Sequence, residues 1–64
     1  MLSSATRRMI KRVVDRHPDA YQFMPETKDT HESFERRGYV KIIGPRLAVA
    51  TDKALREFGD ELPR

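Results

Sequence analysis

The residues of this chain best equipped for chemistry are the cations near its amino terminus. Five of them fall within one short segment, whose one acidic residue is Asp15; they are Arg7, Arg8, Lys11, Arg12 and Arg16. Guanidinium and ammonium groups at this density can bind a polyanion, and each phosphate they neutralise releases counterions, so that affinity falls steeply with salt. An equally simple interpretation is a solvated helix face that keeps a small protein soluble.

Positive charge recurs further along the chain. Residues 39–50 contain two cations and no acid, whereas residues 19–38 carry five carboxylates against three cations. If residues 39–50 lie beside the first segment, the two groups form one phosphate-binding strip. In the acidic segment, three residues are best suited to contact a groove or a backbone: Lys28, Ser33 and Arg36. The candidate nucleic-acid-binding residues are therefore Arg7, Arg8, Lys11, Arg12, Arg16, Lys28, Ser33, Arg36, Lys41 and Arg46.

Two residues of the third segment have more specific candidate roles. Arg46 could enter a minor groove of DNA, because the narrow minor groove of A-tracts attracts guanidinium groups. Tyr39 could stack on a base or hydrogen-bond a phosphate, or it could close the edge of the core instead.

Residue types for catalysis and metal binding are sparse. The chain has no cysteine, and His31 with Glu35, at helical i, i+4 spacing, has no third ligand nearby. Asp29, His31 and Ser33 point in different directions on a helix, so they make no triad. The sequence contains no P-loop, dinucleotide, nucleophile-elbow or metalloprotease motif. We therefore expect no enzyme, no metal or other cofactor and no small-molecule substrate.

Length and composition limit the fold. The chain has 64 residues and a formal net charge of +3, and its length allows one domain over residues 1–64. Its 36% charged and 38% apolar residues are typical of a folded domain rather than a disordered one. Without cysteine it has no disulfide framework. No apolar run approaches the roughly 18 residues of a membrane span, and the start lacks the apolar region of a signal peptide. These features predict a soluble, cytoplasmic protein without a membrane partner.

Apolar spacing predicts the first element that positions the cations. Three- and four-residue steps indicate an amphipathic helix with the basic residues on its other side. Its apolar positions are Leu2, Ala5, Met9, Ile10, Val13, Val14 and His17. Ser3 or Ser4 can cap its start, and Pro18 should end it.

A short turn and a second helix are predicted next. Asp19 and Gln22 have the spacing of a capping box, so a helix could begin at residue 19. Pro25 should stop this helix, which leaves room for one or two turns at most. A helix over residues 26–38 follows, with Thr27 as N-cap and Gly38 in the left-handed conformation after its last turn. Its inward stripe is Phe34 with Thr27, Thr30 and His31.

A β-hairpin is predicted over residues 39–50, closed by a two-residue loop at Gly44 and Pro45. This loop pairs Ile43 with Arg46, Ile42 with Leu47, Lys41 with Ala48, Val40 with Val49 and Tyr39 with Ala50. It puts one apolar set on the core face: Val40, Ile42, Leu47 and Val49.

A final helix is predicted after the hairpin, capped by Thr51 or Asp52 and ended by Pro63. Its inward stripe is Ala54, Leu55, Phe58 and Leu62. The predicted fold is α+β, in the order helix, short helix or turn, helix, β-hairpin, helix.

The run from Thr27 to Leu62 resembles the second half of a winged helix-turn-helix domain. The resemblance rests on T-x-x-T-x-x-x-F-x-x-R-G-Y-V from Thr27 to Val40 and on R-L-A-V-A-T from Arg46 to Thr51. In that family a recognition helix leads through a basic-Gly-aromatic-Val junction into a wing, and a return strand and a Thr-initiated helix follow. Here the candidate recognition helix is net acidic, and the element before it is short. The resemblance implies a small winged-helix-like domain that binds double-stranded DNA.

Two functions remain open at this point. The first is a small nucleic-acid-binding protein acting mainly through phosphates, as a regulator or accessory factor in transcription, recombination or phage biology. A homodimer is expected, because a short core gains stability from a partner and palindromic half-sites favour two-fold symmetry. The second is a protein-interaction module, such as a small inhibitor or subunit, that docks on a larger protein through acidic helices. Its apolar anchors would be Phe23, Met24 or Ile43.

Overall fold

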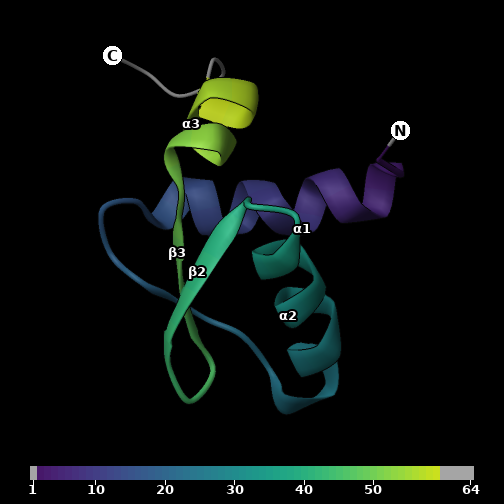
Figure 1. Ribbon diagram of the computed structural model, residues 1–64, viewed down its shortest axis with the longest axis vertical. Coiled ribbons are helices and arrows are strands. Elements are labelled where there is room, and N and C mark those ends of the chain that lie inside the picture. The colour runs from purple at the N-terminus through teal and green to yellow at the C-terminus, as the bar shows by residue number, and fades with distance from the viewer. Residues whose placement is uncertain (1, 60–64) are drawn as a thin grey trace.

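The computed structural model describes residues 2–59, which form three α-helices and a three-stranded sheet (Figure 1). The elements in chain order are α1 (Ser4–Arg16), β1 (Tyr21–Gln22), the 3₁₀-helix η1 (Pro25–Thr27), α2 (Lys28–Arg36), β2 (Val40–Gly44), β3 (Leu47–Ala50) and α3 (Asp52–Phe58). The strands are antiparallel in the order β1-β3-β2. The predicted α+β class is confirmed, and the order of elements is compatible with a small winged-helix-like fold.

Helix α1 forms as its apolar spacing predicts. Ser3 is the N-cap, and its hydroxyl accepts a hydrogen bond from the Thr6 amide at 3.1 Å. The buried residues of the helix are Ile10, Val13 and Val14. Ala5 and His17, which the spacing also placed inward, are exposed because they lie at the two ends of the helix. The buried stripe is therefore confined to the middle and second half of α1.

Residues 19–24 do not form the predicted helical turn. Tyr21 and Gln22 make the strand β1, and the chain stays extended to Phe23, whose amide donates to the Arg46 carbonyl at 2.8 Å. Phe23 belongs to the core and Tyr21 packs against it, while Gln22 between them is exposed. This two-residue alternation is that of a strand, and pairing with β3 outweighs the local capping-box pattern.

Helix α2 is two residues shorter at each end than predicted. Pro25 begins η1 instead of ending a helix. In the first turn of a helix the backbone N–H groups have no partner within the helix, so a proline there costs no hydrogen bond. Thr27 is the N-cap residue of α2, as predicted, but its hydroxyl donates to the Met24 carbonyl at 3.1 Å and makes no capping bond to the helix. Beyond α2, Gly38 adopts a φ of 87°, as predicted.

Aromatic packing around His31 anchors α2 to the sheet. His31 and Phe34 are buried, which confirms the centre of the predicted stripe. The imidazole stacks on Phe23 with ring centroids 4.4 Å apart and an interplanar angle of 10°. Its Nδ1 lies 2.9 Å from the Thr27 carbonyl oxygen, an acceptor, so Nδ1 carries the proton. Phe23, expected as an exposed anchor of the second hypothesis, is buried at 2% exposure.

The hairpin forms at the predicted place but in a register one residue away. The observed pairs are Val40 with Ala50, Lys41 with Val49, Ile42 with Ala48 and Gly44 with Leu47. A bulge between Ile42 and Gly44 takes up one residue, and the loop is Pro45–Arg46 rather than Gly44–Pro45. The fixed φ of Pro45 suits the second position of a type II turn, and Arg46, at a φ of 65°, takes the third.

This register reverses the two faces of β3. Ala48 and Ala50 belong to the core or pack against it, whereas Leu47 and Val49 alternate with them and do not. The prediction that Leu47 and Val49 are core residues is therefore wrong. Ala48 is completely buried, and its small side chain lets α1 lie close to the central strand.

Thr51 caps α3 and ties it to the end of α2. Its hydroxyl donates to the Gly38 carbonyl and accepts from the Ala54 amide at 3.3 Å. Lys53 adds a bond from its Nζ to the Arg37 carbonyl at 2.9 Å. The predicted inward residues Ala54 and Phe58 are buried and Leu55 packs against the core, while Leu62 and Pro63 lie outside the described residues.

Replacing Thr51 by alanine is expected to lower the free energy of unfolding by about 1–2 kcal/mol, because the cap and the bond to Gly38 are both lost. Urea unfolding followed by circular dichroism measures the change. Thr51→Ser keeps the hydroxyl and should stay within about 0.5 kcal/mol of the parent. Equal losses in the two variants would contradict the capping role.

Candidate nucleic-acid interface

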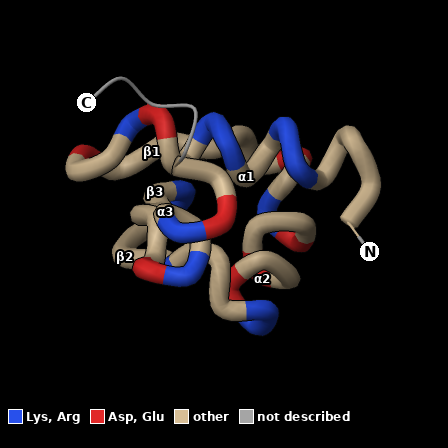
Figure 2. The backbone as a smooth tube through the Cα atoms, turned by 90° about the horizontal axis from the view of Figure 1, so that it is seen from above, with Lys and Arg blue, Asp and Glu red and all other residues tan. Residues whose placement is uncertain are grey.

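Helix α1 turns most of its cations away from the core. Successive residues are rotated by about 100°, so Arg8 and Arg12 lie on the side opposite Ile10, Val13 and Val14. Figure 2 shows basic segments recurring along α1, at one side of the molecule, with β2 at the other. The exposed cations of the helix are Arg7, Arg8, Arg12 and Arg16, and Lys11 is half-buried.

A shallow depression lies over this outward face of α1. The residues that line it are Ser4, Arg7, Arg8, Lys11, Arg12 and Asp15. All belong to one helix, so their spacing is fixed, and Arg8 and Arg12 are separated by about 6 Å along its axis. Asp15 is the one acid among them. A chain of closely spaced phosphates can contact several of these cations at once.

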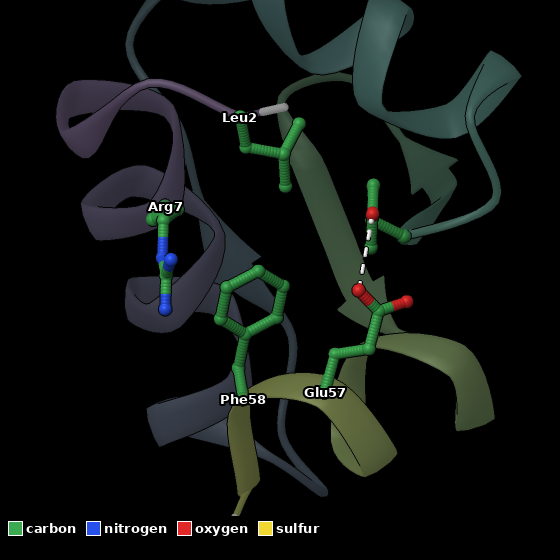
Figure 3. Close-up of a pocket in the computed structure, with 5 residues that line it drawn as sticks. Leu2, Arg7, Glu57 and Phe58 are labelled. Atoms are coloured by element: carbon green, nitrogen blue, oxygen red, sulfur yellow. Dashed lines mark hydrogen bonds between the residues drawn. The ribbon is translucent and has the colours of Figure 1, made fainter.

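Arg7 lies where this face meets a second pocket. That pocket has a volume of about 370 Å³ and is lined by Leu2, Arg7, Tyr39, Glu57 and Phe58 (Figure 3). The guanidinium carbon of Arg7 is 5.9 Å from the centre of the Phe58 ring, within cation–π range. Arg7 is thus held in part by α3, whereas Arg8 and Arg12 project from the open side of α1.

Tyr39 closes the edge of the core at this second pocket. Its ring is buried, its hydroxyl donates to Glu57 Oε1 at 3.3 Å, and the Lys53 ammonium lies 4.5 Å from the ring centre. Burial raises the pKa of Tyr39 above its ordinary value of 10.0, and the Glu57 carboxylate raises it further. The phenol therefore stays protonated at neutral pH and keeps donating to Glu57. Of the two expected roles, the geometry favours closure of the core over contact with a ligand.

The structure does not bring the hairpin cations beside α1. Lys41 pairs with Val49 and points to the outer face of the sheet, whereas α1 packs on the inner face. Arg46 lies in the turn, which Figure 1 shows at the end of the hairpin away from α1. The prediction that the cations of α1 and those of the hairpin form one strip is therefore wrong. Alternation along β2 decides this, because Lys41 cannot share the face of its buried neighbour Val40.

The cations of α2 are balanced by acids. Lys28 and Arg36 are exposed and Ser33 is half-buried. Asp29 and Glu32 lie on the same outward side of the helix, since three- and four-residue steps bring these positions together. The outward side of α2 thus carries no excess of positive charge, and it suits a polyanion less well than α1 does.

One acid of α2 has a backbone partner that the sequence did not indicate. Glu35 Oε2 accepts a hydrogen bond from the Ile42 amide at 2.9 Å, beside the bulge in β2. This carboxylate is therefore engaged within the fold and is not paired with His31 for a metal. The bulge and the contact between α2 and β2 are tertiary features, so no spacing in the sequence could have revealed the bond.

Neither a metal centre nor a membrane segment is found among residues 2–59. No three His, Cys, Asp or Glu side chains gather there as a metal site would need. In the same range no helix has the length and apolar character to cross a membrane. Comparison with protein-family models, curated proteins and solved structures finds no match to this chain.

Proposed function

We propose that this protein binds nucleic acid, in the first place double-stranded DNA, through phosphate contacts made by the outward face of α1. The observation that supports the proposal is the row of exposed cations along α1, a helix whose one acid is Asp15. Duplex DNA carries one charge per about 1.7 Å of its axis, so several cations of a helix can meet phosphates together.

This mode differs from the one that the winged-helix resemblance implies. A recognition helix reads base edges in the major groove, and acidic side chains there face repulsion from the flanking phosphates. The outward side of α2 carries Asp29 and Glu32, which disfavours that geometry. Phosphate contacts fix a protein on a duplex without reading its sequence. The proposed role is thus a sequence-tolerant regulator or accessory factor in transcription, recombination or phage biology.

Salt dependence is the direct test. With about four phosphate contacts, the slope of log K against log salt is expected near −3.6, and affinity should fall about 100-fold between about 50 and 200 mM salt. Fluorescence anisotropy of a labelled duplex measures both quantities. An unrelated duplex sequence of the same length should bind equally well, because the contacts are to the backbone.

Matched neutral substitutions locate the contacts. Arg8→Gln with Arg12→Gln should reduce the salt slope by about 2, one for each phosphate contact removed. Lys41→Gln with Arg46→Gln removes the same charge from the hairpin and should leave the slope unchanged. Absence of binding at low salt, or equal slopes in the two double variants, would overturn the proposal.

A protein-interaction module is the second candidate, and one observation favours it. Met24 and Ile43 are 59% and 54% exposed, so both large apolar side chains are accessible to a partner. They could serve as apolar anchors for a larger protein, and the acidic residues Asp29 and Glu32 could meet a basic surface of it. Affinity capture with identification of the partner by mass spectrometry tests this. Retention that survives Met24→Ser with Ile43→Ser would argue against these anchors.

A further inference from the structure

The pocket beside α1 and α3 combines apolar walls with two opposite charges. Leu2 precedes α1, Phe58 ends α3 and Tyr39 precedes β2, so three separate parts of the chain supply its apolar surface. Arg7 and Glu57 complete the lining, and Figure 3 shows them on opposite sides of the Phe58 ring. The volume of about 370 Å³ lies at the lower end of the range of ligand pockets, so the pocket suits a small molecule.

The two charges of this pocket are not paired with each other in the part of the chain that the structure describes. Within residues 2–59, the Arg7 guanidinium contacts the Phe58 ring and no carboxylate. Glu57 accepts the Tyr39 hydroxyl through Oε1, and its Oε2 has no donor among the same residues. A small molecule that enters the pocket therefore meets unused N–H donors on one side and an unused carboxylate oxygen on the other.

Contacts within the fold hold both charges in place. The Tyr39 ring is buried and packs edge-on against Phe58, with centroids 5.8 Å apart and an interplanar angle of 68°. Its hydroxyl donates to Glu57, while Arg7 rests against the same Phe58 ring. Side chains that are already positioned lose less freedom when a ligand binds. Tyr39 is thus a positioning residue, which orients Glu57 from the edge of the core.

We infer that this pocket binds a free α-amino acid with an apolar side chain. The carboxylate of the amino acid meets Arg7, its ammonium group meets Oε2 of Glu57, and its side chain lies against Leu2 and Phe58. A simple anion is repelled by Glu57 and a simple cation by Arg7, so the lining favours a ligand that carries both charges. The inference does not depend on the proposed binding of nucleic acid.

The exposure of the two charges sets the strength of binding. Arg7 and Glu57 are both exposed, and charge contacts at such positions are weakened by water and salt. An apolar amino acid has about a dozen non-hydrogen atoms, which at the usual efficiency per atom corresponds to a dissociation constant of about 1–10 mM. Such a ligand is released readily, as suits a reversible signal.

Titration of the full chain with L-phenylalanine, followed by NMR of the backbone amides, tests the inference at neutral pH. Saturable shifts are expected at Tyr39 and Phe58 up to about 50 mM ligand. Two analogues each lack one charge: 3-phenylpropionate has no ammonium group, and 2-phenylethylamine has no carboxylate. Each analogue should bind about threefold to tenfold more weakly than L-phenylalanine.

Two neutral variants separate the loss of one contact from a folding defect. Arg7→Gln should weaken the binding of L-phenylalanine and 3-phenylpropionate about threefold to tenfold, but not that of 2-phenylethylamine. Glu57→Gln should weaken the binding of L-phenylalanine and 2-phenylethylamine, but not that of 3-phenylpropionate. Arg56→Gln removes an exposed cation of α3 that does not line the pocket, so all three affinities should stay unchanged.

Several results would contradict these expectations. Absence of saturable shifts up to about 50 mM L-phenylalanine overturns the inference. Equal affinities for the three probes show that the charges do not contact the ligand, which overturns the assignment to an amino acid. Losses of equal size for all three probes in both variants overturn the assigned contacts of Arg7 and Glu57.

Discussion

Replacing Phe23 by alanine is expected to lower the free energy of unfolding by about 3–5 kcal/mol. Phe23 is 2% exposed and stacks directly on the imidazole of His31, which in turn packs against Phe34. Its removal leaves a cavity at the junction of β1 and α2. At about 0.05–0.15 kcal/mol per residue, a chain of 64 residues has a total stability of about 3–10 kcal/mol. The variant should therefore be largely unfolded at the lower end of that range.

The neighbouring residue supplies the control for this substitution. Met24 follows Phe23 directly and is 59% exposed, so Met24→Ala should change the free energy of unfolding by no more than about 0.5 kcal/mol. Urea titrations followed by circular dichroism compare the two variants. Similar unfolding midpoints for Phe23→Ala and Met24→Ala would show that the aromatic stack does not hold the fold together.

Reversing two charges on α1 should abolish the binding of nucleic acid. Arg8→Glu with Arg12→Glu removes two phosphate contacts and places two carboxylates among the cations that remain. At about 50 mM salt the affinity for a labelled duplex is expected to fall by at least about 100-fold, more than for the neutral variant at these positions. Both side chains lie opposite the buried stripe of α1, so the free energy of unfolding should change little.

The matching reversal on α2 distinguishes the two candidate functions. Asp29→Lys with Glu32→Lys changes the net charge by the same amount in the opposite direction. It should tighten duplex binding slightly if α1 is the site, and it should abolish capture of a protein partner if the acidic side is the site. Glu35 is unsuitable for this test, because its carboxylate accepts a hydrogen bond from the Ile42 amide. Loss of this bond would disturb β2. Tight duplex binding by the Arg8→Glu, Arg12→Glu variant would exclude α1.

The helices could be predicted from the sequence because their signals are local. Apolar steps of three and four residues placed Ile10, Val13 and Val14 inward, and the same rotation placed Arg8 and Arg12 outward. Caps and breakers act within one turn, which is why the ends of α1 and the start of α3 lie where expected. The outward cations of α1 are thus a part of the candidate site that sequence alone could supply.

The sheet could not be predicted in detail, because its signals are not local. The segment L-A-V-A is apolar at every position, so its alternation does not indicate which face is buried. The turn, the bulge and the close approach of α1 together decide that Ala48 faces inward. The expected strip of cations failed for another reason: Lys41 alternates with the buried Val40 in either register, so it faces away from the side of the sheet on which α1 packs.

The bond between Glu35 and the Ile42 amide has a consequence for how copies of this chain can associate. An open sheet edge is a template on which further strands add without limit, and fibres grow in this way. At one edge β2 is interrupted by its bulge, and its Ile42 amide is already taken; at the other edge β1 has two residues. The addition of further strands along the hydrogen-bonding direction is thereby obstructed at both edges of the sheet, so the fold resists growth into a filament by strand pairing.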